Sequence, residues 1–273
     1  MQPLSDLARL SLNQMTTEPW DVQAAVAGCA RAGIPAIGLW RHKVAETGLA
    51  QSARIVRDAG IAVSSLCRGG MFPAADTAGR RARIDDNRRA IDEAAELGAD
   101  VLVLVCGPAP DRDIAAAREM VAEGIAAVAP YAEERGVRLA IEPLHPMFAA
   151  DRSVIVTLGE ALDLAERFPR AQVGVVIDVY HVWWDPQLYD QIARAAGRIL
   201  GFHVNDWLAP PPEHLNGRGM MGDGAIELRR MRAAVDAAGY DGPIEVEIFN
   251  RALWALPGDD LLALMCERYL AHV

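Results

Sequence analysis

Residues 173–184 read VGVVIDVYHVWW, an almost unbroken apolar run that is rich in Val and Ile. Such a run predicts a strand buried on both faces, the kind found in parallel sheets. The strand carries Asp178 out of a dry core, and His181 follows three residues later. Because an unpaired buried charge is costly, Asp178 needs a partner, and a metal ion or a cation is the usual one. The alternative is that Asp178 caps the next helix.

The alternation of strand and helix continues in both directions from this stretch. Apolar runs predict further strands at residues 7–12, 36–40, 61–67, 101–106, 137–142, 199–205 and 244–249. Helical patterns follow at residues 17–32, 46–59, 78–97, from 111 or 113 to 135, 158–168, 185–197 and 225–238, and a last one starts at Pro257. Eight such units without a linker predict an α/β fold, a single-domain (β/α)8 TIM barrel over residues 1–273. A doubly wound sheet is the alternative.

The composition narrows the class of protein. With 273 residues, 52% of them apolar, the chain can bury a sizeable core. The net charge of −10 disfavours a nucleic-acid partner, whose affinity comes largely from neutralised phosphates. We find no basic and apolar leader before Leu10, and no apolar run near the roughly 18 residues of a membrane span. The four cysteines form no CxxC pair, so we expect a cytoplasmic protein with reduced thiols and no membrane partner.

Polar residues end four consecutive predicted strands. They are Glu142, Asp178, His203 and Glu247. Active sites of TIM barrels lie at the carboxyl ends of strands, and adjacent strands are about 4.8 Å apart, so the four side chains should converge. Three acids this close repel one another without a cation, and the mixed O/N set suits Mn²⁺, Mg²⁺, Co²⁺ or Zn²⁺. The alternative is a set of unrelated helix caps and core salt bridges.

The last of these positions has a competitor. Glu245 and Glu247 are two residues apart, so both point to the same side of the predicted strand. Glu247 lies closer to the carboxyl-terminal mouth of the barrel, level with the other three polar residues. We therefore expect Glu247, rather than Glu245, to belong to the metal site.

Several segments resemble the sugar phosphate isomerase/epimerase superfamily, the xylose isomerase-like TIM barrels. They are residues 139–143 (LAIEP), 177–181 (IDVYH), 202–206 (FHVND), 218–226 (RGMMGDGAI), 239–243 (GYDGP) and 246–249 (VEIF). The resemblance extends over nearly the whole chain. Within the superfamily, the chain resembles keto-sugar 3-epimerases and the catalytic subunits of C-glycoside deglycosidases. The motifs are specific for the superfamily but do not identify a substrate.

The resemblance implies a metal-dependent isomerase or epimerase that acts on a keto sugar or a sugar derivative. In keto-sugar epimerases, the positions of the four polar residues bind one divalent metal ion, for which Mn²⁺ is our first expectation. The positions of Glu142 and Glu247 also act as acid and base, and those of His181 and Arg218 contact the substrate. This chemistry is physically consistent, since a metal ion stabilises the enediolate that forms when a proton is removed beside a carbonyl.

Other residues near the predicted strand ends are further candidates. His145 follows a predicted metal-ligand strand and is expected either to act as a base or to bind a hydroxyl; the alternative is an ordinary loop histidine. Trp183 and Trp184 could form an aromatic floor for a sugar, or else pack within the protein or against another subunit. Arg68 and Trp40 are further candidates for substrate contact. No cluster of basic residues follows the later strands, which favours a free sugar or glycoside over a phosphorylated one.

Three alternatives to an epimerase stay open. The same enolate could expel a leaving group, which gives a lyase or dehydratase acting by β-elimination on a 3-oxo-glycoside or a keto-inositol-type substrate; His145 and its flanking prolines favour this reading. A remote alternative is an AP endonuclease-like DNA repair enzyme, although the ends of the third and fourth strands lack the extra histidines of that class. A barrel that only binds a partner would hold no metal. From the family, we expect a homo-oligomer, with or without a small accessory subunit.

Overall fold

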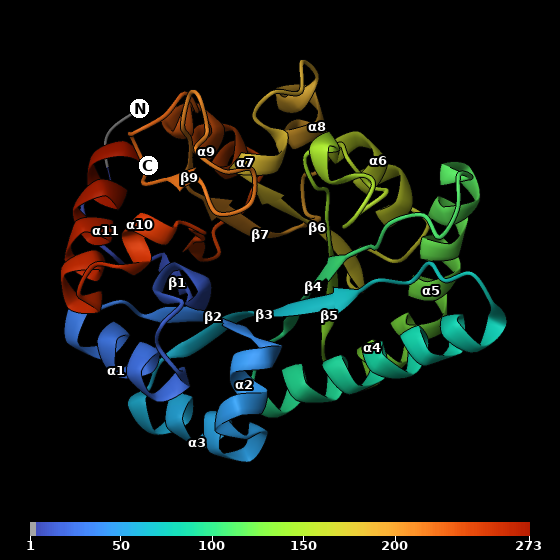
Figure 1. Cartoon of the computed structure of the whole chain (residues 1–273), viewed down its shortest axis with the longest axis horizontal. Coiled ribbons are helices and arrows are strands. Elements are labelled where there is room, and N and C mark those ends of the chain that lie inside the picture. Colours follow the sequence, from blue (N-terminus) through green and yellow to red (C-terminus); the bar gives the residue numbers. More distant parts are fainter. Residues whose placement is uncertain (1–3) are drawn as a thin grey trace.

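Eight parallel strands close into a barrel in the computed structural model, which describes residues 4–273 (Figure 1). The strands are β1 (Leu10–Asn13), β2 (Ala36–Trp40), β3 (Ala62–Gly70), β4 (Val101–Val105), β5 (Arg138–Glu142), β6 (Val173–Asp178), β7 (Ile199–Val204) and β10 (Ile244–Val246). They follow one another around the barrel in chain order, and β10 closes the ring by pairing with β1. The predicted TIM barrel is confirmed.

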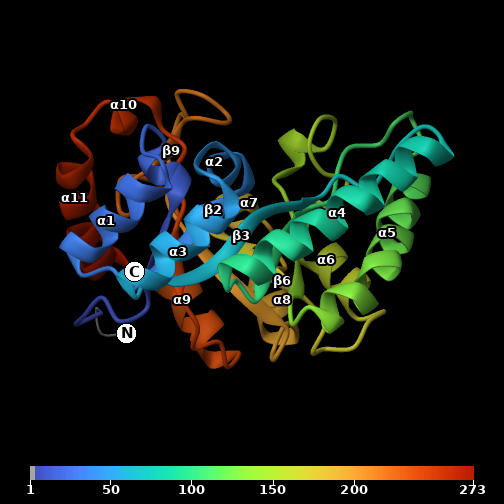
Figure 2. The same cartoon turned by 90° about the horizontal axis from the view of Figure 1, so that it is seen from below.

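Helices cover the outside of the barrel. They are α1 (Val22–Ala32), α2 (Arg41–Thr47), α3 (Leu49–Ala59), α4 (Thr77–Leu97), α5 (Ile114–Glu134), α6 (Leu158–Ala165), α7 (Val179–Val182), α8 (Leu188–Arg194), α9 (Leu228–Ala237), α10 (Arg251–Trp254) and α11 (Gly258–His272). The long helices α4 and α5 pack side by side along one flank (Figure 2). None of the helices within residues 4–273 combines the length and the apolar character needed to cross a bilayer.

The loops carry a few short elements of their own. Two 3₁₀ turns, η1 (Gln14–Thr17) and η2 (Pro146–Phe148), follow β1 and β5. A two-stranded antiparallel ribbon, β8 (Asp206–Trp207) with β9 (Arg218–Gly219), lies in the long segment after β7. The ribbon lies between the strand predicted at 199–205 and the helix predicted at 225–238, where no strand is predicted.

Apolar side chains fill both faces of the strands, as an all-parallel barrel requires. Val173, Val175 and Ile177 of β6 belong to the large cluster between the barrel and its helices. Val176 belongs instead to a small cluster inside the barrel. Because successive side chains of a strand alternate between faces, Asp178 lies on the inner side, two residues beyond Val176. The same alternation that builds the core therefore directs a carboxylate into the barrel mouth.

Some predicted boundaries are wrong. The first helix starts at Val22, after the cap Asp21, whose Oδ1 accepts a hydrogen bond of 2.8 Å from Ala24 N, and Thr17 lies in a 3₁₀ turn. The helix predicted at 46–59 is two helices, because Gly48, with φ of 93°, interrupts it. Helices α6, α8 and α9 are shorter than predicted, and the last strand ends at residue 246 instead of 249.

Strand β3 contains a bulge at Arg68. Cys67 pairs with Val103 of β4, and Gly69 pairs with the next residue, Leu104, so Arg68 has no opposite residue. The expectation that the chain leaves the strand before residue 69 is wrong, because β3 continues to residue 70. Bulges bend a strand and redirect a side chain, and they recur beside active sites.

Asn87 of α4 holds the end of β3 in place. Its side chain is 1% exposed; Oδ1 accepts a hydrogen bond of 2.7 Å from Gly70 N, and Nδ2 donates one of 2.8 Å to Gly70 O. One buried amide thus satisfies both backbone groups of Gly70.

We expect the substitution Asn87→Ala to lower the free energy of unfolding by about 2 kcal/mol or more, because it leaves a buried backbone donor and acceptor unpaired. Urea denaturation measures the change. Gln172→Ala is the matched control, since the Gln172 side chain donates only to the exposed Glu133, and its expected cost is below about 0.5 kcal/mol. Equal losses in the two variants would contradict the assigned role of Asn87.

Candidate metal centre

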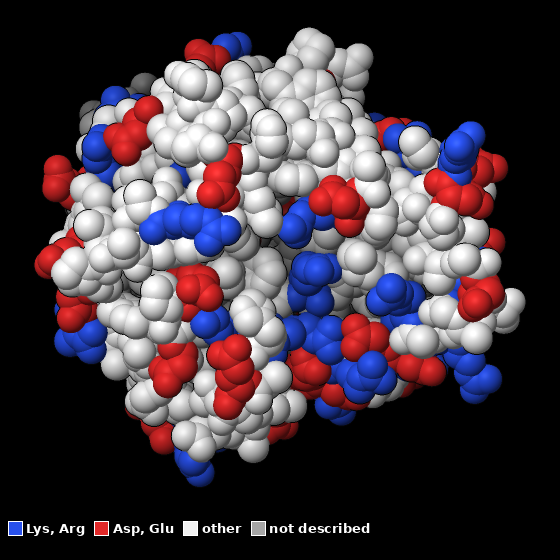
Figure 3. All heavy atoms as spheres, viewed as in Figure 1, with Lys and Arg blue, Asp and Glu red and all other residues white. Residues whose placement is uncertain are grey.

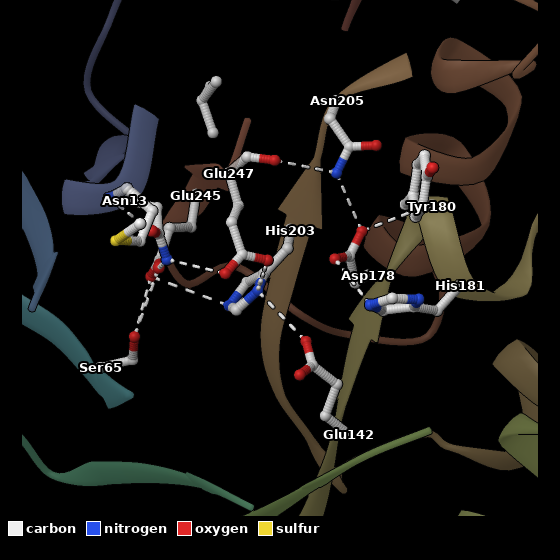
Figure 4. A network of polar contacts seen from close by, with 12 residues as sticks. Asn13, Ser65, Glu142, Asp178, Tyr180, His181, His203, Asn205, Glu245 and Glu247 are labelled. Carbon is white, nitrogen blue, oxygen red and sulfur yellow. Dashed lines mark hydrogen bonds and ion pairs between the residues drawn. The ribbon is translucent and has the colours of Figure 1, made fainter. Parts of the chain in front are cut away.

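Four polar side chains meet at the carboxyl-terminal mouth of the barrel (Figure 4). They are Glu142 at the end of β5, Asp178 at the end of β6, His203 in β7 and Glu247 just after β10. One ligand atom from each lies within 4.8 Å of the others, and all four residues are buried. Within residues 4–273, no other group of three or more such side chains has this geometry. The predicted convergence is therefore seen in the structure.

The donor set fits a divalent cation. Glu142 Oε1 and His203 Nδ1 are both buried and have no hydrogen-bond partner. His203 Nδ1 lies 3.6 Å from Glu142 Oε1 and 3.5 Å from Glu247 Oε2. A buried polar atom without a partner is costly, and a cation among these atoms would satisfy both. Three carboxylates and one imidazole are ligands that Mn²⁺, Mg²⁺, Co²⁺ and Zn²⁺ all accept.

Burial and mutual repulsion perturb the pKa values of the cluster. Burial, followed by the charge of Glu247, raises the pKa of Glu142 to about 8. Burial lowers the pKa of His203, but the charges of Glu245, Glu247 and Glu142 outweigh it and raise that pKa to about 10. Such shifts are typical of functional sites.

Arg218 supplies a positive charge to the cluster. Its Nη1 donates hydrogen bonds to Asp178 Oδ2 at 2.8 Å and to Glu247 Oε2 at 3.0 Å. The guanidinium carbon lies 4.7 Å from the ring centroid of Tyr180 and 4.9 Å from that of Phe249. Burial acts to raise the pKa of Asp178, but Arg218 and the nearby histidines outweigh it and hold that pKa below its usual value. Arg218 thus binds two candidate metal ligands directly.

His181 is placed beside Arg218 by the short helix α7. Its Nε2 lies 3.3 Å from Arg218 Nη2 and 3.7 Å from Asp178 Oδ2. Burial lowers the pKa of His181 to about 3, so the imidazole is neutral at pH 7. Its Nδ1 accepts a hydrogen bond of 3.1 Å from the backbone N of His145, and its Nε2 faces the guanidinium of Arg218, which can only donate. His181 therefore connects Arg218 to the loop that follows β5.

Glu245 lies one layer below the cluster, inside the barrel. Its carboxylate accepts hydrogen bonds from Asn13 Nδ2 at 2.6 Å and from Ser64 Oγ at 2.8 Å, and its Oε2 lies 3.8 Å from His203 Nε2. A Cβ at Gly38 would come within 2.1 Å of Glu245 Oε1, so only glycine leaves room for this carboxylate. Of the two competing glutamates, Glu247 joins the four-residue cluster, and Glu245 faces the other nitrogen of His203.

A cavity of about 360 Å³ opens onto the cluster. Residues that the sequence predicts for the site line this cavity: Glu142, Glu247, His181, Arg218, Arg68 and Trp40. Figure 3 shows Lys and Arg side chains gathered around the hollow in the middle of this face.

His145 and Trp183 do not line this cavity. The His145 ring stacks on Trp207 with a centroid distance of 5.1 Å, and its Nδ1 accepts a hydrogen bond of 3.2 Å from Met147 N. Trp183 also packs against Trp207, at 5.5 Å between ring centroids. The structure therefore gives both residues packing contacts, because Trp207 in the ribbon after β7 lies against them.

Three residues of the site were not predicted from the sequence. Asn13 donates to Glu247 Oε1 at 3.2 Å, and Asn205 donates to Asp178 Oδ1 at 3.0 Å. Arg152, in the loop after β5, lines the cavity. Asn205 follows a predicted ligand by two residues and could have been found by its position, whereas nothing in the local sequence marks Asn13 or Arg152.

The fold and the site together define a TIM barrel with four buried side chains at its carboxyl-terminal mouth that could hold a metal ion. The sequence matches the family described as xylose isomerase-like TIM barrel over residues 26–267. The chain belongs to this family, as its motifs led us to expect.

Known proteins similar to this chain include enzymes of two reaction types. It is 32% identical over 195 residues to the 3-dehydroshikimate dehydratase of Pseudomonas aeruginosa, an alignment that covers 65% of this chain but 28% of that protein. It is 26% identical over 227 residues to the ketose 3-epimerase of Arthrobacter globiformis, covering 79% of this chain and 69% of the epimerase. The crystal structure of protein SMc04130 from Sinorhizobium meliloti is 54% identical, covers 97% of this chain and 98% of its own, and has a TM-score of 0.94.

The substitution Glu142→Gln should lower the affinity for Mn²⁺ at least about 100-fold, since the loss of even an outer partner of a metal ligand costs about 10–100-fold. The stability without metal at pH 7 should hardly change, because a carboxyl with a pKa of about 8 is already neutral there, like the amide. Isothermal titration calorimetry and urea denaturation measure the two quantities. Glu134→Gln, on the exposed face of α5, is the control and should leave both unchanged.

Metal binding should release protons. Without metal, Glu142 and His203, with pKa values of about 8 and about 10, hold protons at pH 7 that a metal ion has to displace. The affinity for Mn²⁺ should therefore rise as the pH is raised from about 6 to about 8. Calorimetry in two buffers with different heats of ionisation counts the released protons, and binding without proton release would contradict this account.

Proposed function

We propose that this chain is a divalent-metal-dependent isomerase or epimerase of a keto sugar or a sugar derivative. The observation that carries the proposal is the pair Glu142 and Glu247, two carboxylates of one candidate metal cluster that line the same cavity. A divalent cation held by the cluster would polarise the carbonyl and the neighbouring hydroxyl of the substrate and stabilise the negative charge of the enediolate. The similarity to a ketose 3-epimerase supports this assignment.

The two glutamates are suited to opposite proton transfers. They come from β5 and β10, which are separated in the barrel by β6 and β7, so they approach the cavity from different directions. One carboxylate takes the proton from the carbon beside the carbonyl, and the other returns a proton from the opposite face. Return to the same carbon gives an epimer, whereas return to the carbonyl carbon gives an isomer. His181 and Arg218 are placed to orient the substrate oxygens by hydrogen bonds.

A lyase or dehydratase is the second candidate, and the similarity to a 3-dehydroshikimate dehydratase favours it. The same proton removal would leave an enediolate. Its electron pair would then expel a leaving group from the next carbon. The leaving oxygen takes up a proton, which the glutamate that removed the first proton can return. A 3-oxo-glycoside or keto-inositol-type substrate would react in this way. An AP endonuclease has less support, because residues 4–273 contain a single four-ligand cluster and the net charge is −10.

The remaining assignments are also proposals. We propose Mn²⁺ as the metal, since three carboxylates and one imidazole are ligands that it accepts well. We further propose a cytoplasmic homo-oligomer, with or without a small accessory subunit. The four free cysteines, three of them buried, support a reducing compartment.

Mn²⁺-loaded protein in D₂O should introduce deuterium beside the carbonyl of a ketose such as D-fructose, which proton NMR detects. Glu247→Gln should slow this exchange at least about 100-fold at saturating Mn²⁺, because it removes one of the two proton carriers. Parallel incubation with 3-dehydroshikimate tests for loss of water. Water loss without exchange into ketoses would favour the lyase, and a protein that binds no metal would exclude both reactions.

A further inference from the structure

Most charged side chains that line the cavity are already paired. Arg218 binds two carboxylates of the cluster, as described above. Arg251 Nε donates a hydrogen bond of 3.1 Å to Glu213 Oε1. Glu18 Oε1 lies 3.8 Å from Lys43 Nζ. Two cavity-lining arginines, Arg68 and Arg152, differ from these.

Arg68 has no partner for its guanidinium. Within residues 4–273, no hydrogen bond or ion pair joins it to another group. The residue is half-buried and stands at the bulge of β3, where the extra residue directs its side chain into the cavity. The two hydrogen bonds between the Asn87 side chain and the backbone of Gly70 fix the chain just beyond Arg68. Its five N–H donors are thus held beside the cavity without an acceptor.

Arg152 is only weakly paired. Its Nε is buried without a hydrogen-bond partner, and its one ion pair, with the adjacent Asp151, is long at 3.9 Å. Its guanidinium carbon lies 5.7 Å from the ring centroid of Phe148, which also lines the cavity. Its backbone O accepts a hydrogen bond of 2.9 Å from Gly107 N, so the end of β4 holds the loop in position.

The two guanidinium groups repel each other. Burial and then the charge of Arg152 lower the pKa of Arg68, while Glu142 acts in the opposite direction without forming an ion pair. Two partly buried cations without a shared anion are unfavourable. Guanidinium groups bind carboxylates and phosphates through paired hydrogen bonds, and one anion between them would remove the repulsion.

We infer that Arg68 and Arg152 form a subsite for an anionic group, a carboxylate or a phosphate, on the substrate of the Glu142–Glu247 site. This inference rests on the proposed function, since it assumes that a substrate reacts in the same cavity. The substrate is then a keto compound with its carbonyl at the metal cluster and its anionic group at the arginines. The expectation of a neutral sugar considered only the later strands, whereas these arginines come from β3 and the loop after β5.

Calorimetry with Mn²⁺-loaded protein and three probes tests the subsite: D-fructose, D-fructose 6-phosphate and 5-keto-D-gluconate. At least one anionic probe should bind about tenfold tighter than D-fructose, and its identity separates phosphate from carboxylate. Arg68→Gln and Arg152→Gln should each weaken that probe about tenfold and change D-fructose binding less than about twofold. Arg31→Gln is the control, because Arg31 pairs with Asp259 on the exposed surface.

Equal binding of the neutral and anionic probes would overturn the subsite, as would variants that weaken all three probes equally. Deuterium exchange into D-fructose without any preference for an anion would leave the proposed function intact and remove only the subsite. Tight, arginine-dependent binding of an anionic probe that shows no deuterium exchange would retain the subsite and contradict the epimerase. Two variants on different elements guard against a folding defect in either one.

Discussion

The barrel mouth is organised around three carboxyl groups that the fold buries close together. Glu142, Asp178 and Glu247 are brought together at the carboxyl ends of β5, β6 and β10. Arg218 donates to two of the carboxylates, and His203 lies beside the third. Even so, Glu142 keeps a buried oxygen without a partner. A cation held among these side chains would give that oxygen a partner.

The layer below the cluster shows how the barrel supports this arrangement. The Glu245 carboxylate lies beside Nε2 of His203, whereas Nδ1 of the same ring faces Glu142 and Glu247. Gly38 has no side chain, and this leaves the space that the Glu245 carboxylate fills. The hydroxyls of Ser64 and Ser65 hydrogen-bond to the same carboxylate. These contacts orient an imidazole whose Nδ1 faces Glu142 and Glu247. A metal ligand oriented by an outer carboxylate is a common arrangement in metalloproteins.

The metal cluster alone does not distinguish an epimerase from a lyase, because both begin with the same proton removal. The groups around the rim of the cavity decide which substrate is held and which bond breaks. Here the rim contains the neutral His181 and the guanidinium groups of Arg68 and Arg152. An anionic group held at those arginines would fix the position of the substrate relative to the two glutamates. In the proposed reaction, the loops and one strand bulge would therefore select the substrate.

The sequence by itself determined the barrel and the four residues of its cluster. Strand periodicity is local, and parallel strands in a closed barrel carry Glu142, Asp178, His203 and Glu247 to one end, so both could be predicted without coordinates. The tertiary structure alone decided which neighbouring side chains face the cavity. His145 and Trp183 pack against Trp207, whereas Arg152 lines the cavity, because the direction of a loop side chain depends on contacts with residues distant in sequence. The bulge at Arg68 depends likewise on its pairing with β4, which no local pattern of residues encodes.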